Sequence, residues 1–391
     1  MTARDDLSRA CAQVGLIWPP PAEQPWLGEV LPGAAGALGT DAPEAVAAAR
    51  RLGLPAVDRV VVVLVDGMGR VNLAERGGHA PFMRRLLAGS PSLTSAFPST
   101  TATSLASLGT GLAPGATGML GYTVRNPTTG GLANLVSWTG LPDPEQWQVQ
   151  PTWFERLVAA GVTVHSVGPA AFDGSGLTRA ALRGSTYLAA ESLPDRVDAA
   201  VAAARKPGLV YLYWGEVDKI GHHQGWQSHA WGDALQATDS ELARLARSLR
   251  PGTLLLITAD HGMVDVDRSL RWDVATSPAL AEGVALVTGE PRAMQLHLEP
   301  GTDLAEVVTR WRETLGEHAV VVTGHDAVDA GLFGEVTSHA APVVGGVVVA
   351  MAGRATVVDS RTQTPFSLEL VGVHGSLTEH ETTIPLLLVE T

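Results

Sequence analysis

Lysine and cysteine are scarce in this chain, and long apolar runs are absent. Only two of its 391 residues are lysines, and the formal net charge is −13. Surfaces that bind nucleic acid polymers gain affinity by neutralising phosphates with lysine and arginine. The charge balance therefore argues against a nucleic acid polymer as a partner.

The single cysteine, Cys11, cannot form an intramolecular disulfide, so nothing indicates an oxidising compartment. The N-terminal residues lead into no long apolar segment, and no run approaches the ~18 apolar residues of a membrane span. We therefore expect a cytoplasmic protein with no membrane partner. The oligomeric state stays open.

What is present is an ordinary globular composition, with 45% hydrophobic and 17% charged residues. Strand-like apolar runs alternate with helix-like segments, which is typical of an α/β fold with a mostly parallel sheet between helix layers. In such folds ligands gather at the carboxyl ends of the strands. The expected strands cover residues 57–65, 162–167, 209–214, 254–258 and 384–389, and the expected helices 42–52, 151–160, 195–204 and 229–249.

The length suits one large core with an inserted module. Proline and glycine between residues 17 and 40 predict an irregular N-terminal arm over residues 1–40. After residue 271 the expected secondary structure changes. Short strands are expected at 283–288, 292–298 and 319–323, with a helix at 303–315 between the second and the third. We therefore expect a core of residues 1–271 and 341–391, and a small α+β cap of residues 272–340.

A run of hydroxyl side chains at residues 97–104 follows a short strand-like segment and precedes a helix of small residues. Proline followed by serine or threonine is also typical of a capped helix start, so this run alone does not indicate catalysis. Its weight comes from side chains of metal-ligand type that recur near strand ends before and after it: Asp66, Asp218, His222, Asp260, His261 and His374.

Two pairs among these residues have informative spacing. Asp218 and His222 are four apart, so on one helical turn both could reach one cation. Asp260 and His261 are adjacent just past a strand, where a turn can direct both side chains inward. A solvated aspartate and a core histidine are the alternative explanation for Asp218 and His222 alone, and the pair Asp260-His261 alone is a weak signal.

Taken in order, the motifs resemble the alkaline phosphatase superfamily, and most of all its nucleotide pyrophosphatase/phosphodiesterase branch, in a bacterial form. The resemblance covers roughly residues 57–263 and the stretch from Gly372. It rests on Asp66, Thr101, Asp218-x-x-Gly-His222, Asp260-His261-Gly262 and Gly372-Val373-His374-Gly375.

The resemblance implies two divalent metal ions, expected to be zinc, and Thr101 as a nucleophile that forms a phospho-threonyl intermediate. One ion would be held by Asp66, Asp260, His261 and the Thr101 oxygen, and the other by Asp218, His222 and His374. The family nucleophile lies nine residues before a Thr-Gly pair, and Thr110-Gly111 counts back to Thr101. Ser99 and Thr100 are the fallback choices.

Two aromatic residues bear on the substrate. Tyr122 stands where relatives carry an asparagine that donates to a phosphoryl oxygen, and we expect its hydroxyl to take over that contact. The alternative is that its ring packs beneath the site or against the cap. Tyr213 matches a position where relatives stack an aromatic ring on a nucleobase, although it could also be part of an ordinary aromatic strand.

The sequence thus predicts a metal-dependent hydrolase of phosphoric diesters or nucleotide pyrophosphates, with a small phosphate ester as its partner. A phosphomonoesterase or phosphonate hydrolase on the same scaffold is the first alternative. Monoesterases need extra cationic donors, and no Lys-x-Arg pair lies between Tyr122 and Tyr211 to provide them. A metal-binding protein without turnover is a second alternative, against which the retained hydroxyl of Thr101 argues.

Overall fold

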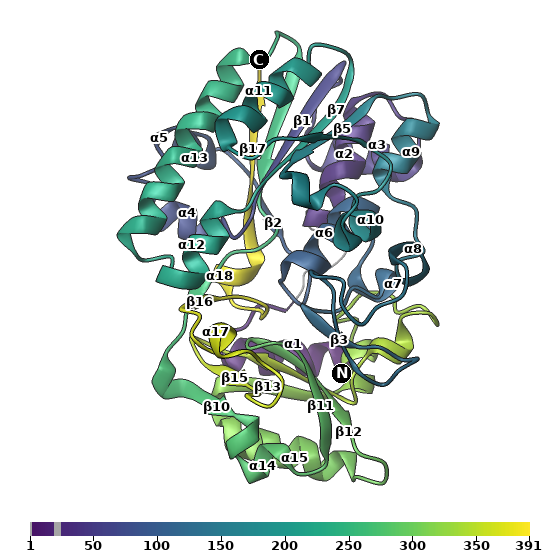
Figure 1. Cartoon of the computed structure of the whole chain (residues 1–391), viewed down its shortest axis with the longest axis vertical. Coiled ribbons are helices and arrows are strands. Elements are labelled where there is room, and N and C mark those ends of the chain that lie inside the picture. The colour runs from purple at the N-terminus through teal and green to yellow at the C-terminus, as the bar shows by residue number, and fades with distance from the viewer. Residues whose placement is uncertain (1, 19–24) are drawn as a thin grey trace.

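The computed structural model describes residues 2–18 and 25–391, and its centre is a seven-stranded sheet (Figure 1). Five neighbouring strands are parallel, and β17 runs antiparallel to β8 and β2 at one side. The expected α/β fold with a mostly parallel sheet is therefore confirmed. In sheet order the strands are β2 (Ser92–Thr94), β17 (Thr383–Glu390), β8 (Thr253–Thr258), β1 (Arg59–Val65), β7 (Gly208–Trp214), β5 (Val164–Gly168) and β6 (Thr186–Ala189).

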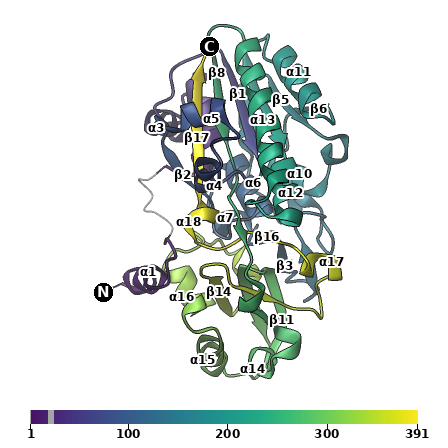
Figure 2. The ribbon, with the colours of Figure 1, turned by 90° about the vertical axis from the view of Figure 1, so that its left-hand side faces the viewer.

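Strand β1 lies in the middle because its valine-rich sequence can be buried on both faces. Helices cover both faces of the sheet (Figures 1 and 2). One layer contains α4 (Arg70–Glu75), α5 (Pro81–Leu87), α11 (Leu193–Ala203), α12 (Glu216–Gln224) and α13 (His229–Ser248). The other contains α2 (Val30–Ala37), α3 (Pro43–Arg51), α6 (Thr101–Thr110), α9 (Trp153–Ala159) and α10 (Gly176–Ala181).

A second, four-stranded antiparallel sheet lies beyond the carboxyl ends of the parallel strands, in the lower part of Figure 1. We call it the cap sheet, and it has its own apolar cluster around Trp311. Its strands, in sheet order, are β11 (Val284–Glu290), β12 (Ala293–Leu298), β14 (Val347–Met351) and β13 (Ala319–Thr323). Helices α14 (Pro278–Ala281), α15 (Leu304–Leu315) and α16 (Gly324–Asp329) accompany it.

The cap sheet includes β14, which lies beyond residue 340, where we expected the core to resume. Its run of apolar residues resembles a core strand, and only its pairing with β12 and β13 shows where it belongs. The division of the chain at residues 272 and 340 stays a prediction.

The remaining helices and strands are short: β3 (Thr123–Arg125), β4 (Leu132–Asn134), α7 (Pro114–Thr117), α8 (Pro144–Trp147), β9 (Val264–Asp265), β10 (Arg271–Asp273), β15 (Thr356–Val358), α17 (Pro365–Leu368), β16 (Gly372–Val373) and α18 (Glu379–Thr382).

The N-terminal region is not the irregular arm that its proline and glycine content predicted. Helix α1 (Ala3–Gln13) packs against α16 of the cap (Figure 2), and α2 packs on α3. The glycines of α2 serve close packing, since a Cβ on Gly36 would lie 2.3 Å from the carbonyl oxygen of Ala45. The proline-rich part of the expected arm, residues 19–24, lies outside the described residues.

A buried ion pair fastens the cap sheet to the core. Arg292 precedes β12, and its Nη2 lies 2.8 Å from Oε2 of Glu381 in α18, with both side chains fully buried. The guanidinium also donates to the backbone oxygens of Met351 and Ala355, so its charge and its donors are satisfied. No helix in the described ranges has both the length and the apolar content that crossing a bilayer requires.

Candidate metal centre

The ligand-type residues meet at one edge of the central sheet because parallel strands end on the same side. Asp66 follows β1, Asp218 lies in α12 just after β7, and Asp260 follows β8. His374 comes from a distant part of the chain, directly after β16. Residues more than 300 positions apart therefore share one site.

A first group consists of Asp66, Asp260 and His261, whose nearest ligand atoms all lie within 4.8 Å of one another. The Nε2 atom of His261 is 3.4 Å from Oδ1 of Asp66 and 3.3 Å from Oδ2 of Asp260. All three side chains are buried. These are the three protein side chains expected to hold one ion together with Thr101.

A second group consists of Asp218, His261 and His374. We expected His222 here, and its Nε2 lies 3.2 Å from Oδ2 of Asp218, while Nε2 of His374 lies 3.8 Å from Oδ1 of the same carboxylate. The rings of His261 and His374 are stacked, with centroids 3.6 Å apart, which joins the two groups into one cluster.

The three histidines share a hydrogen-bonding pattern that suits metal ligands. Each Nδ1 lies 2.8–3.0 Å from a backbone carbonyl oxygen, that of Gly372 for His222, Gly262 for His261 and Ser99 for His374. A carbonyl oxygen only accepts, so each Nδ1 donates, and in the neutral ring the lone pair is left on Nε2. Each Nε2 faces a carboxylate, so nitrogen and oxygen donors converge where a cation could be held.

The carboxylates point to the same conclusion. Asp66 Oδ1, Asp218 Oδ1 and Asp260 Oδ2 are buried and have no hydrogen-bond partner. Burial, followed by repulsion from Asp260 and Asp218, raises the pKa of Asp66 well above its usual value. Crowded, unpaired carboxylates of this kind are expensive unless a cation neutralises them, so the donor set fits divalent metal ions.

Thr101 is the first residue of α6, after the N-cap residue Thr100. Its Oγ1 lies 3.3 Å from Nε2 of His261, beside the first group. The fallback residue Ser99 is fully buried, and its hydroxyl donates to the carbonyl oxygen of Ser376 at 2.7 Å. Ser99 is therefore engaged elsewhere, and the geometry favours Thr101 over it.

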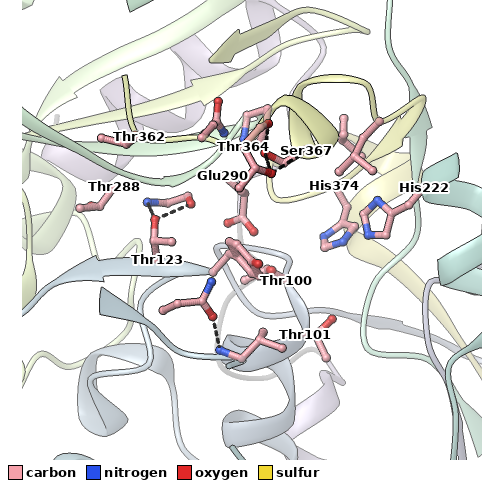
Figure 3. Close-up of a pocket in the computed structure, with 18 of the residues that line it drawn as sticks. Thr100, Thr101, Thr123, His222, Thr288, Glu290, Thr362, Thr364, Ser367 and His374 are labelled. Carbon is pink, nitrogen blue, oxygen red and sulfur yellow. Dashed lines mark hydrogen bonds between the residues drawn. The ribbon is translucent and has the colours of Figure 1, made fainter. Parts of the chain in front are cut away.

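A cavity of about 660 Å³ opens in front of this cluster, between the core and the cap sheet. Figure 3 shows Thr100, Thr101, His222 and His374 lining it on the core side and Glu290 facing them from the cap. Its described lining contains no arginine and one lysine, Lys219. Apolar lining comes mainly from Leu132, Val136, Val287, Met294, Val357, Phe366, Leu370 and Val373.

Tyr213 has a contact that sequence reasoning did not anticipate. It lines the cavity, its hydroxyl donates to Oδ2 of Asp66 at 2.5 Å, and its ring centroid is 5.7 Å from that of Phe172. This hydrogen bond orients an expected metal ligand. Stacking of a nucleobase on Tyr213 stays a prediction.

Tyr122 lies at the mouth of the cavity, where its side chain is 43% exposed. A donor in contact with water contributes less to stabilising developing charge than one in a dry site. We therefore expect Tyr122→Phe to lower kcat by less than ~tenfold, because the ring rather than the hydroxyl shapes the cavity mouth.

Steady-state kinetics of Tyr122→Phe on the best diester will check this expectation, with Tyr122→Ala as the variant that also removes the ring. A fall of ~10²–10³ in kcat with Tyr122→Phe would instead indicate that the hydroxyl contacts a phosphoryl oxygen, as the sequence comparison with relatives first suggested.

Sequence reasoning missed Glu290 altogether. It is one of 40 acidic residues, lies in the cap away from every motif, and follows no pattern that distinguishes it from a surface carboxylate. Only the approach of the cap sheet to the core brings it into the cavity.

Comparison with solved structures places this fold among known ones. The murine ectonucleotide pyrophosphatase / phosphodiesterase 5 aligns with a TM-score of 0.67 at 18% identity, covering 84% of this chain and 87% of the murine chain. Phosphonoacetate hydrolase from Sinorhizobium meliloti 1021, in complex with phosphonoformate, aligns with a TM-score of 0.64 at 19% identity, covering 85% and 90%. At these identities the likeness concerns the fold alone.

Curated relatives match over shorter stretches. A phosphopentomutase of Sinorhizobium medicae is 32% identical over 166 residues, which is 39% of this chain and 39% of that protein. The matched stretch is therefore well under half of the relative. The family model for type I phosphodiesterase / nucleotide pyrophosphatase matches residues 60–377, which is most of this chain and contains all the motif positions described above. The chain thus belongs to the type I phosphodiesterase / nucleotide pyrophosphatase family, as its motifs predicted.

Proposed function

We propose that this protein hydrolyses phosphoric diesters or nucleotide pyrophosphates with Thr101 as the nucleophile. The observation that carries the proposal is a hydroxyl at the first turn of α6, 3.3 Å from His261, beside three aspartates that each have a buried, unpaired carboxylate oxygen. A site that only binds metal could rely on the six other ligands, so a hydroxyl in this place favours catalysis.

Asp66, Asp260, His261 and Thr101 would hold one metal ion, and Asp218, His222 and His374 a second, for which zinc suits the nitrogen and oxygen donors. Bound there, the ions would favour ionisation of the Thr101 hydroxyl and offset charge on the phosphoryl oxygens. Tyr213 keeps Asp66 oriented through its hydrogen bond.

In the proposed reaction Thr101 Oγ1 attacks phosphorus, the bond from phosphorus to the leaving oxygen breaks, the proton lost by Thr101 balances the one that the leaving oxygen takes up to become an alcohol, and a phospho-threonyl group forms. Water then attacks that phosphorus and releases Thr101 with its proton restored. The N-terminus of α6 adds backbone N–H groups and a positive dipole next to the phosphoryl group.

The charge of the cavity supports a diester over a monoester. A monoester brings a second negative charge and needs additional cationic donors. The described lining offers only Lys219, whose Nζ lies 3.4 Å from Glu216 and whose side chain is largely exposed. The murine relative was also solved as an inactive variant in complex with AMP, which is consistent with a nucleotide-sized substrate.

A phosphonate hydrolase or phosphomonoesterase is the second candidate, because a phosphonoacetate hydrolase shares the fold. The test is kcat/KM of zinc-loaded protein for bis(p-nitrophenyl) phosphate, p-nitrophenyl phosphate and phosphonoacetate. We expect the diester to be preferred over the monoester, since one fewer charge must be compensated.

A monoester preference above ~100-fold, or turnover of phosphonoacetate alone, would move the protein to the second candidate. Absence of turnover on all three substrates by fully metal-loaded protein would favour a binding protein instead. Protein with Thr101 replaced by alanine provides the background rate for each substrate.

A further inference from the structure

Glu290 lies in the cavity but takes no part in the chemistry proposed above. It is the last residue of β11, and Figure 3 shows its carboxylate directed from the cap towards Thr100. A Cβ on Gly375 would lie 2.6 Å from its Cγ, so Glu290 also packs against the loop that carries His374. It therefore borders the chain neighbours of the proposed nucleophile and of a proposed metal ligand.

The carboxylate of Glu290 has no ion-pair partner among the described residues. The residue is only 7% exposed, neither carboxylate oxygen makes a hydrogen bond of regular geometry, and the Thr100 side chain is a neutral neighbour. Burial raises the pKa of Glu290 to about 8, outweighing the lowering effects of the Thr100 side chain and of His222. Buried carboxylates in native proteins are normally paired or hydrogen-bonded, so an unpaired one facing a cavity indicates where a ligand group belongs.

Another acidic residue of the cavity lining, Asp359, has its negative charge balanced by an arginine. Both oxygens of Asp359 are bonded by the guanidinium of Arg361, at 2.7 and 2.8 Å. Glu290 has no such guanidinium, and Lys219, the lysine of the described lining, is paired with Glu216. Of these two acids, Glu290 is the one that lacks a cationic partner, which a cationic group of a ligand could provide.

We propose that Glu290 binds a positively charged ammonium group of the substrate, so that the cavity selects phosphate diesters in which one alcohol carries a short aminoalkyl chain. The diester part of this inference rests on the proposed function, and the ammonium part rests on Glu290. An ammonium brings three N–H donors and a charge, and hydrogen bonds between charged groups are roughly twice as strong as neutral ones. The ion pair would also bring the carboxylate back to its ionised form.

The test compares two esters of nearly equal size, 2-aminoethyl p-nitrophenyl phosphate and n-propyl p-nitrophenyl phosphate. Their affinities are measured by calorimetry on zinc-loaded protein with Thr101→Ala, which removes the nucleophile. We expect the ammonium ester to bind ~10–100-fold more tightly, and Glu290→Gln in the same background to reduce this preference to within ~threefold.

The matched control is Asp359→Asn, which removes a cavity carboxylate that Arg361 already balances, and it should retain the preference. Equal affinities before any change at Glu290, or a preference that survives Glu290→Gln, would overturn the proposal. If Glu290→Gln does not fold, the comparison of the two esters with Glu290 intact remains a test, because equal affinities for them would refute the proposal.

Turnover of both esters by the unmodified protein tests the diesterase function separately. A binding preference without turnover would reject that function and keep the ammonium site.

Discussion

Thr101→Ala is expected to lower kcat by at least ~10³-fold on any diester the protein hydrolyses, while fold and metal content change little. The substitution removes a hydroxyl that lies 3.3 Å from Nε2 of His261, while Thr101 is only partly buried at the start of its helix. Single-turnover kinetics, circular dichroism and elemental analysis of the same preparation measure the three properties together.

Two neighbours serve as controls. Thr103 lies in the same helix, fully buried, and its hydroxyl has no hydrogen-bond partner, so Thr103→Ala measures the effect of losing packing alone. Ser99→Ala removes the hydrogen bond to Ser376 and should cost ~1 kcal/mol of stability but less than ~tenfold in kcat. A larger loss of kcat with Ser99→Ala than with Thr101→Ala would show that the nucleophile is two residues earlier.

Removal of bound metal is expected to abolish turnover and to lower the melting temperature by about 5–10 °C. Asp66, Asp218 and Asp260 are crowded in a buried site, and two like charges 4 Å apart repel by about 4 kcal/mol at an effective dielectric constant of 20. Elemental analysis before and after a chelator should show about two zinc ions per chain and then none. Readdition of zinc should restore activity and melting temperature.

Asp260→Asn should reduce metal content and shrink the difference in melting temperature between loaded and chelated protein. Asp265→Asn is the control, because Asp265 accepts the backbone N–H of Trp226 at 2.8 Å and lies outside both metal-ligand groups. Protein purified without chelator that contains no stoichiometric transition metal, yet turns over diesters, would contradict the metal-dependent mechanism.

The order of strands and helices in the core could be predicted from local pattern. The run Arg59–Val65 is apolar on both faces, which is typical of a strand inside a parallel sheet covered by helices, and four further runs rich in apolar residues follow the same alternation with helices. The N-terminal region misled the prediction because glycine and proline, typical of loops, here allow α2 to approach α3 closely. Strand β14 could not be assigned to its sheet, because pairing partners are set by contacts across the chain.

The sequence by itself determined which residues are candidate metal ligands, through the motif order that resembles the family and through their positions at the common edge where parallel strands end. Only the tertiary structure decided how these residues lie relative to one another. It brought His374 onto His261, directed the hydroxyl of Tyr213 to Asp66, occupied Ser99 with a backbone contact and left Tyr122 exposed at the cavity mouth. It also brought Glu290 of the cap to the core without a cationic partner among the described residues, since burial and pairing depend on surroundings that no local pattern encodes.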